Sequence, residues 1–271
     1  MSGARKFVLR LSSILVVAGV ISLAGTATLA QPTANVQRVA PTFTVDGRIA
    51  LHSFVALSDA HLKKLADLLN LLATTDDARS GEWERIRGPL AGLTPITVPA
   101  VLWFAQPNGS YWTVTEGRAA GNLSDRAYFP RVLSGQTIMG DLVVSRSTNR
   151  NTAIVAVPVR NRDKTVVGVL GASIHLDRLG ELVRQEMGGL GDDLLFFAID
   201  STPRGALHSD PTMVFTEPMK LGDEGMRKAF TEMLSRTEGT VSYTFRGRPR
   251  TVLYRKSPVT GWWYAMGILQ K

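Results

Sequence analysis

The residues best suited to chemistry lie between positions 125 and 131, which read Asp-Arg-Ala-Tyr-Phe-Pro-Arg. The guanidinium of Arg126 can grip a carboxylate through two parallel hydrogen bonds. Tyr128 adds a hydroxyl donor, and Phe129 adds an apolar wall. Arg131 is a second candidate clamp, with a position on a helix surface as its alternative. This short segment therefore favours the recognition of a small anion.

The rest of the chain contains none of the common catalytic motifs. Its four histidines do not form the His-Glu-x-x-His pair of a zinc protease. It has no nucleophile elbow and no phosphate-binding glycine loop. The carboxylate pairs Asp76-Asp77 and Asp192-Asp193 lie in polar turns and are predicted to be solvated. We therefore expect no enzyme, no cofactor and no metal, although a Ser/His/Asp triad leaves no local signature in a sequence.

Composition narrows the class of protein further. The 271 residues carry a net charge of +8, and the basic side chains are dispersed except for a local group between 246 and 255. A nucleic-acid-binding protein more often shows a dense basic stripe with interleaved aromatic residues, so no nucleic-acid partner is expected. The chain has no cysteine, which excludes disulfides and thiolate metal sites.

The N-terminus has the order of a secretory signal peptide. Basic side chains precede position 11, residues 11–23 are mainly apolar, and residues 24–30 are small except for Leu29. We expect residues 1–30 to be a cleaved signal peptide, with an uncleaved membrane anchor as the alternative. A polar linker would follow over 31–47. Both outcomes predict a periplasmic or otherwise extracytoplasmic protein, tethered to the inner membrane if the segment is retained.

A leading helical segment is expected over residues 48–95. The main helix should run from 48 to 75, because an apolar stripe follows one face. Its members recur at spacings of three and four: Leu62, Leu65, Leu69 and Leu72. A second short helix is predicted over 81–86, with Ser80 as its N-cap and residues 88–89 as its end.

Two blocks of similar order follow, over residues 96–188 and 189–271. In the first, the predicted strands are 99–105, 110–115, 141–145, 152–159 and 165–174, with helices at 125–133 and 177–187. In the second, the predicted strands are 194–200, 206–208, 240–245, 250–256 and 262–269, with a helix at 222–235. Two strands, a helix and three strands thus occur twice. This pattern predicts an α+β chain with two tandem modules, each built on a mainly antiparallel five-stranded sheet.

Several short pieces in this order resemble a double Cache sensor region, a relative of PAS domains. The matching pieces are Asp125–Phe129, Val157–Val159, Gly168–Gly171, Gly239–Tyr243 and Thr260–Trp262. The resemblance implies two stacked PAS-like modules behind a long helix. It also implies that residues 96–188 form the membrane-distal module, which usually holds a small ligand, and that 189–271 form the membrane-proximal module.

The resemblance also suggests which ligand class the distal module takes. Relatives that bind amino acids carry an Arg-x-aromatic-aromatic motif, which stands here at 126–129. Their upstream aromatic residue is Gly121 in this chain, and their downstream acid is Ser173. A buried ligand ammonium needs an anionic or carbonyl partner. Without that acid, an organic carboxylate is favoured over an amino acid.

Four further residues are candidates for the wall of such a site. Tyr111 and Trp112 are neighbours on one predicted strand, so only one of them can face inward. Ser145 and Ser173 lie on predicted central strands, where a serine can line a cavity or bond to backbone. An aromatic cluster at 262–264 is predicted to be structural, with one tryptophan packed inward.

These observations predict an exported sensor module that recognises a small solute. Since no span or output domain is found before Lys271, we expect it to act through a separate signalling partner in the membrane. The main rival is an interaction module of the same fold that binds an envelope protein and no ligand. An unrecognised periplasmic hydrolase is the least favoured alternative.

Overall fold

The computed structural model describes residues 6–9, 43–188 and 193–269. The predicted signal peptide and linker therefore lie largely outside the described residues. Within those regions, strand β1 (Lys6–Leu9) pairs antiparallel with β2 (Phe43–Asp46). No helix of the described part is both long enough and apolar enough to cross a membrane.

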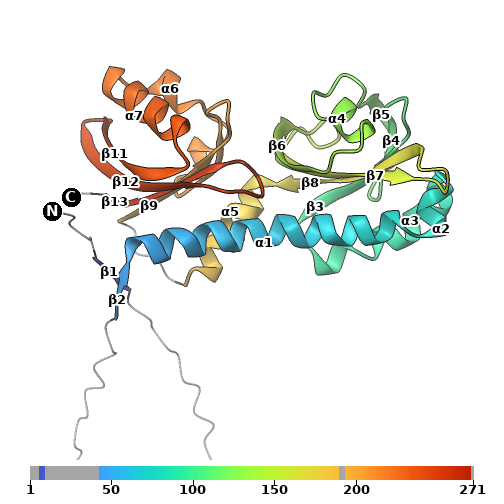
Figure 1. Ribbon diagram of the computed structural model, residues 1–271, viewed down its shortest axis with the longest axis horizontal. Helices are drawn as coiled ribbons and strands as arrows, with labels where there is room; N and C mark the ends of the chain where they lie inside the picture. The colour runs from blue at the N-terminus through green and yellow to red at the C-terminus, as the bar shows by residue number, and fades with distance from the viewer. Residues whose placement is uncertain (1–5, 10–42, 189–192, 270–271) are drawn as a thin grey trace, which may run out of the picture.

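One long helix, α1 (Gly47–Ala73), runs beneath two sheets that stand side by side on it (Figure 1). Asp46 caps its first turn by accepting a hydrogen bond of 2.7 Å from the backbone N–H of Arg48. The leucine stripe predicted from the sequence is buried against the sheets, as expected for an amphipathic helix. Near its start, Phe54 makes edge-on contacts with Phe196 and Tyr264 of the second sheet.

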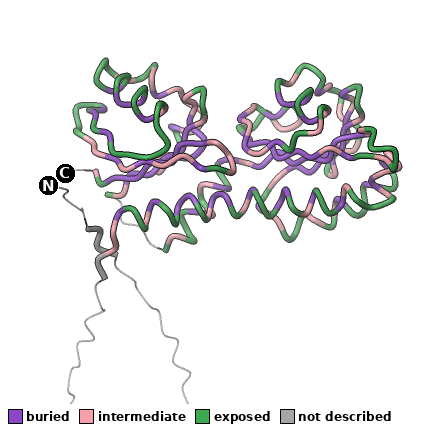
Figure 2. The backbone as a smooth tube through the Cα atoms, in the orientation of Figure 1, coloured by how far each residue is buried: buried purple, intermediate pink, exposed green. Residues whose placement is uncertain are grey.

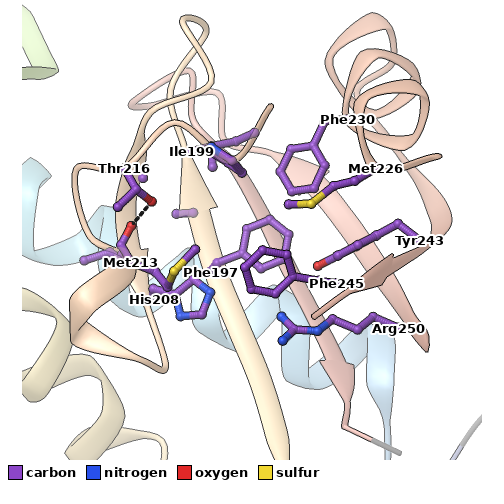
Figure 3. A pocket seen from close by; sticks show the side chains of 14 residues that line it. Phe197, Ile199, His208, Met213, Thr216, Met226, Phe230, Tyr243, Phe245 and Arg250 are labelled. Atoms are coloured by element: carbon purple, nitrogen blue, oxygen red, sulfur yellow. Dashed lines mark hydrogen bonds between the residues drawn. The ribbon is translucent and has the colours of Figure 1, made fainter. Parts of the chain in front are cut away.

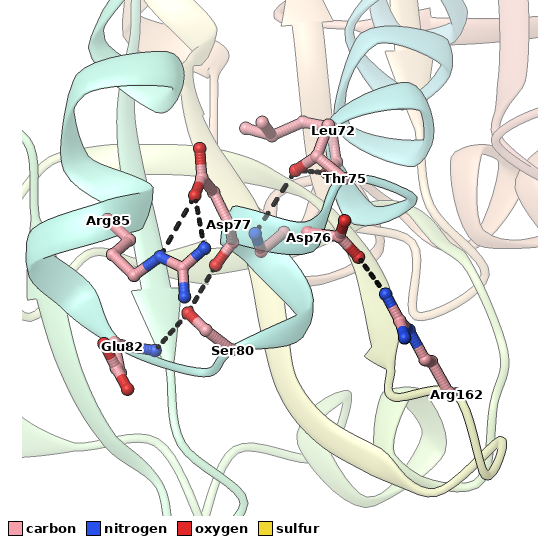
Figure 4. Close-up of polar contacts among 9 residues, drawn as sticks. Leu72, Thr75, Asp76, Asp77, Ser80, Glu82, Arg85 and Arg162 are labelled. Atoms are coloured by element: carbon pink, nitrogen blue, oxygen red, sulfur yellow. Dashed lines mark hydrogen bonds and ion pairs between the residues drawn. The ribbon is translucent and has the colours of Figure 1, made fainter.

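A compact turn follows α1 and leads into α2 (Asp76–Arg79) and α3 (Trp83–Ala91) (Figure 4). Asp77 accepts hydrogen bonds from Arg85, and Asp76 pairs with Arg162 at 3.4 Å. All four of these side chains are exposed, which confirms that the Asp76-Asp77 pair is solvated.

The predicted limits of the second helix are wrong. Ser80 ends α2, and its hydroxyl accepts from the N–H of Glu82, which is the residue that precedes α3. Pro89 lies inside α3 and does not end it. A proline removes one N–H from the ladder, but the backbone bond from Gly92 to Gly88 still closes the last turn at 3.1 Å.

The first sheet has six antiparallel strands in the order β5-β4-β3-β8-β7-β6. Their bounds are β3 (Ala100–Ala105), β4 (Ser110–Thr113), β5 (Gly117–Asn122), β6 (Ile138–Val144), β7 (Asn151–Arg160) and β8 (Val166–His175). The edge strand β5 is one more than the sequence predicted. The expected helix at 125–133 shortens to α4 (Phe129–Leu133), with a turn before it.

The second sheet has five antiparallel strands in the order β10-β9-β13-β12-β11. Their bounds are β9 (Leu194–Ile199), β10 (Gly205–His208), β11 (Glu238–Phe245), β12 (Arg248–Lys256) and β13 (Trp263–Ile268). Helix α5 (Leu176–Glu186) joins the sheets, and η2 (Pro211–Met213), α6 (Pro218–Leu221) and α7 (Glu224–Ser235) cover the far face of the second. Setting β5 aside, both sheets have the same spatial order, so the α+β class and the repeated arrangement of strands are confirmed.

Each sheet is buried on both faces (Figure 2). One apolar cluster lies between α1 and the two sheets and includes Phe104, Val155 and Tyr264. Separate clusters lie on the opposite faces, beneath α4 on the first sheet and beneath α7 on the second. Trp262 belongs to the cluster on the α1 side, whereas Trp263 faces α7, as strand alternation requires.

Candidate functional site

A hollow lies on the first sheet, on the face opposite α1. Its wall is formed by β3, β4, β7, β8, the end of β6 and the loops before α4 and after β6. The residues that line it are Trp103, Tyr111, Leu123, Arg126, Tyr128, Val143, Ser145, Arg146, Ser147, Ile154 and Ser173. Five of the eight residues selected from the sequence thus meet at one place: Arg126, Tyr128, Tyr111, Ser145 and Ser173.

The base of the hollow depends on a close contact between neighbouring strands. The indole N–H of Trp103 on β3 donates to the hydroxyl of Ser173 on β8 at 3.2 Å. The Trp103 ring lies over Gly171, where an added Cβ would come within 2.2 Å of a ring carbon. Only glycine therefore allows the indole to lie flat against β8.

Arg126 reaches the hollow from the turn that precedes α4. Its Nη2 donates to the backbone carbonyl of Val144 at 2.9 Å, which holds the half-buried side chain against the end of β6. A guanidinium has five N–H donors, and this bond uses one of them. The side chain is thus fixed at the rim with donors to spare for an acceptor.

A second arginine, Arg146, was not selected from the sequence. It follows β6 in the loop to β7, where its guanidinium pairs with Asp125 and also donates to the carbonyl of Asn122. The hydrogen bond from Arg146 lowers the pKa of Asp125, and the charges of Arg146 and Arg126 add to the effect. An arginine between two serines in a loop looks like an ordinary solvated residue in the sequence, so no local signal marked it.

Two tyrosine hydroxyls face the same hollow. Burial raises the pKa of Tyr128 above its ordinary value, and the nearby Arg126 and Arg146 oppose that rise only in part. Burial also raises the pKa of Tyr111, again against the two arginines. Both side chains therefore stay protonated at neutral pH and are able to donate hydrogen bonds.

Gly121, the position at which the family resemblance predicts an aromatic residue, adjoins this hollow. A Cβ added there would lie 3.4 Å from Cδ of Arg146 and 3.7 Å from the Tyr111 ring. Serine at 173, the position of the expected acid, lines the base. Among the lining residues, all of which the structure describes, none is an aspartate or glutamate.

Three of the residues selected from the sequence lie elsewhere. Phe129 is fully buried in the cluster beneath α4, because the first turn of α4 points it toward the sheet. Arg131 forms an exposed ion pair of 2.8 Å with Asp141, so the surface alternative holds for it. Trp112 points to the α1 side of the sheet, where it stacks with Trp83 and Phe104. Alternation along β4 therefore leaves Tyr111 on the side of the hollow.

The hollow is nearly closed by its own side chains. Its free volume of about 20 Å³ holds roughly one water molecule. A solute of several heavy atoms would have to displace side chains, and the partly exposed Arg146 is the group best placed to move. Within the described part of the chain, no cluster of three or more metal-ligating side chains occurs at this hollow or elsewhere.

Comparisons with known proteins agree with this fold. No protein-family model matches the chain, and no curated protein does. Among solved structures, the extracellular domain of rpHK1S-Z16, described as a histidine kinase, has a TM-score of 0.67 at 15% identity and covers 82% of this chain and 92% of its own.

Two chemoreceptor domains from Pseudomonas are similar to the same extent. The ligand-binding domain of PctB from Pseudomonas aeruginosa, solved with L-Arg, has a TM-score of 0.62 at 16% identity, covering 83% of this chain and 92% of its own. The ligand-binding domain of CtaA from Pseudomonas fluorescens, solved with L-alanine, has a TM-score of 0.63 at 14% identity. The match covers 83% of this chain and 94% of the CtaA domain. The chain therefore has the fold of Cache-type extracellular ligand-binding domains of bacterial receptors and kinases.

Proposed function

We propose that this protein is an extracytoplasmic sensor module that recognises a small organic carboxylate in the hollow of the first sheet. The observation that carries the proposal is the convergence of two guanidiniums and two tyrosine hydroxyls on a hollow with no lining carboxylate. In this proposal, Arg126 grips the carboxylate, and Tyr111 and Tyr128 add hydrogen bonds. The modules would stack as in double Cache proteins, with the first sheet distal to the membrane.

The charge of the site favours an anion over a zwitterion. Arg126 and Arg146 offer charge-assisted donors, each worth about 1.5–3 kcal/mol when well aligned. An amino acid would add an ammonium group, and the lining side chains offer it hydroxyls but no carboxylate. The amino acids and GABA bound in similar domains all carry a carboxylate, and that shared group is the part this site is suited to hold.

Binding would act on the rest of the molecule by shifting a conformational equilibrium. A solute can shift such an equilibrium only by the difference in its affinity for the two states. Here that difference would arise when Arg146 leaves Asp125 to contact the solute. A membrane-bound signalling partner would read the change, which accords with an exported protein carrying the signal peptide expected from the sequence.

A thermal-shift experiment on the full chain tests this function. Acetate, lactate and succinate are compared with lactamide and L-alanine at equal concentration. We expect at least one carboxylate to raise the melting temperature, and lactamide to have no effect. In Arg126→Ala the affinity should fall about 10-fold to 100-fold, the loss of one charge-assisted pair.

Arg131→Ala is the matched control, because this arginine lies on the same segment but pairs with Asp141 outside the hollow. An equal loss of affinity in Arg126→Ala and Arg131→Ala contradicts the carboxylate proposal. So does stabilisation by L-alanine but by none of acetate, lactate and succinate. If no solute stabilises the protein at all, the nearly closed hollow is better explained by the ligand-free interaction module.

A further inference from the structure

A second hollow lies on the other sheet, beneath η2, α6 and α7 (Figure 3). It occupies the same place in its module as the first hollow does, on the face away from α1. Its lining is mainly aromatic and thioether: Phe197, Phe230, Phe245, Met213 and Met226. An interior of this kind suits the hydrocarbon part of a ligand.

The polar groups of this second hollow gather on one side. Figure 3 shows Arg250 and His208 pointing toward one another, with the Tyr243 hydroxyl directed inward and Phe230 and Met226 at the opposite side. The Nδ1 of His208 accepts a hydrogen bond of 2.8 Å from the backbone N–H of Asp210. That bond leaves the proton of the neutral ring on Nε2, so His208 can act as a donor.

Arg250 keeps an unsatisfied donor at this hollow. Its guanidinium lies 4.7 Å from the centre of the Phe245 ring, and its Nε is buried without a hydrogen-bond partner. No carboxylate among residues 43–188 and 193–269 forms an ion pair with it. A partly buried cation with an unpaired donor is stabilised by an incoming anion.

The two hollows also receive an arginine from corresponding strand pairs. Arg146 lies in the loop between β6 and β7, and Arg250 is the third residue of β12, which forms a hairpin with β11. These strand pairs occupy the same positions in the common strand order. The repeat has therefore placed a cation beside a hollow in each module.

We propose that the second hollow is a separate binding site for a small apolar monocarboxylate, aromatic or branched aliphatic. The carboxylate would bind Arg250 with help from His208 Nε2 and the Tyr243 hydroxyl, while the hydrocarbon part lies among the phenylalanine rings. The free volume is about 20 Å³ at present, so Met213 and Met226 must change rotamer to admit the ligand. Methionine side chains adapt in this way at little cost.

The test uses the full chain with methyl-labelled methionine and benzoate as the probe, followed by NMR. Benzoate should shift the methyl signals of Met213 and Met226, and leave that of Met139, which packs on the α1 side of the first sheet, unchanged. Benzylamine, which has the same ring and the opposite charge, should shift none of them. Arg250→Ala should weaken benzoate binding about 10-fold to 100-fold.

Arg248→Ala is the matched control, because it removes an exposed arginine from the same strand. Arg126→Ala should leave benzoate binding unchanged, which separates this site from the one in the first sheet. If Arg250→Ala does not fold, Arg250→Gln replaces it, and the preference of the wild type for benzoate over benzylamine remains a test without any variant.

Three results would overturn the proposal. The first is the absence of any methionine shift at about 10 mM benzoate, a concentration far above the range of a specific site. The second is an equal shift with benzylamine. The third is an unchanged affinity for benzoate in a folded Arg250 variant. Equal shifts with both probes would mean that the aromatic interior takes up any ring and that Arg250 has no part in binding.

Discussion

The two sheets share one strand order but enclose hollows of opposite character. The first hollow is lined by arginines, tyrosines and serines, and the second by phenylalanines and methionines with a single arginine. Because the backbone order is the same, the difference resides in the side chains that a few strands and loops supply. The comparison shows that the strand order common to both sheets can carry either a polar or an apolar hollow.

The long helix meets the two sheets in different ways as well. Its contacts with the first sheet are apolar, whereas near the second sheet it buries a carboxylate. The hydroxyl of Ser257 donates to Asp59 of α1, at 2.8 Å and 2.7 Å from the two carboxylate oxygens. The attachment of α1 to the second sheet therefore includes a buried titratable group.

The largest effect is expected from Gly171→Ala. The added methyl group would meet the Trp103 ring at 2.2 Å, which overpacks the base of the first hollow and costs about 1–3 kcal/mol. Calorimetry should show a melting temperature lower by several degrees, together with loss of solute binding in the first hollow. Gly180→Ala is the control, since its methyl group would meet only Leu207 at 3.7 Å. Equal stability of the two variants would mean that the indole moves aside freely.

Arg146→Ala should have the next largest effect, and only on the first hollow. Removing the second guanidinium should weaken carboxylate binding about 10-fold and leave benzoate binding at the second hollow unchanged. NMR titration should also show the pKa of Asp125 rising toward its ordinary value, because the hydrogen bond from Arg146 is gone. Arg162→Ala, which removes an exposed partner of Asp76, should change neither site. A tighter carboxylate site in Arg146→Ala would show that this arginine blocks the hollow.

The pH response of the α1 contact should be visible in Asp59→Asn. Burial raises the pKa of Asp59 to about 6 from an ordinary value of 3.8, so the folded state binds a proton that the unfolded state lacks between these values. Asp59 therefore adds stability as the pH falls from 6 toward 4, and removes it as the pH rises. In melting curves recorded between pH 6 and 4, Asp59→Asn should lack the rise in melting temperature that this protonation gives the wild type. An unchanged pH profile would mean that the carboxylate is solvated.

His208→Asn is expected to give a pH effect of opposite sign. Burial lowers the pKa of His208 to about 4 from an ordinary value of 6.5. Between these two values, the imidazole is protonated in the unfolded state but not in the folded state. His208 therefore costs stability as the pH falls from 6.5 toward 4. Asparagine keeps an acceptor near the Asp210 N–H but does not titrate, and should remove this cost. The wild-type protein combines the contributions of Asp59 and His208. Below pH 6, Asp59→Asn should therefore be less stable than the wild type, and His208→Asn should be more stable. If the melting temperatures of His208→Asn and the wild type change with pH in parallel, His208 makes no contribution to the pH dependence of stability.

Elements with strong periodic patterns could be predicted from the sequence. The leucine stripe of α1 and the long apolar strands β7 and β8 were located to within about two residues, the usual uncertainty of such boundaries. Strand β5 was missed because Gly-Arg-Ala-Ala-Gly-Asn contains no β-branched or large aromatic residue, and only its pairing with β4 makes it a strand.

The site was predictable in part for a similar reason. The aromatic and basic residues at 126–128 stand together in the sequence, and strand alternation limited the choice between Tyr111 and Trp112. Trp103 and Arg146 join them only through pairing of distant strands and the path of a loop, for which no local pattern exists. The second hollow was missed because its apolar lining is indistinguishable from core in a sequence.

The two sheets also contact one another directly, without the helix. The indole N–H of Trp262 donates to the carbonyl of Gly140 at 2.9 Å, in the bulge of β6, and the ring leaves only 3.1 Å for any Cβ there. The end of this same strand carries the carbonyl that holds Arg126. Gly140 and Val144 thus lie on one strand, and a shift of β6 caused by a solute in the polar hollow would be passed to the second sheet through the Trp262 hydrogen bond.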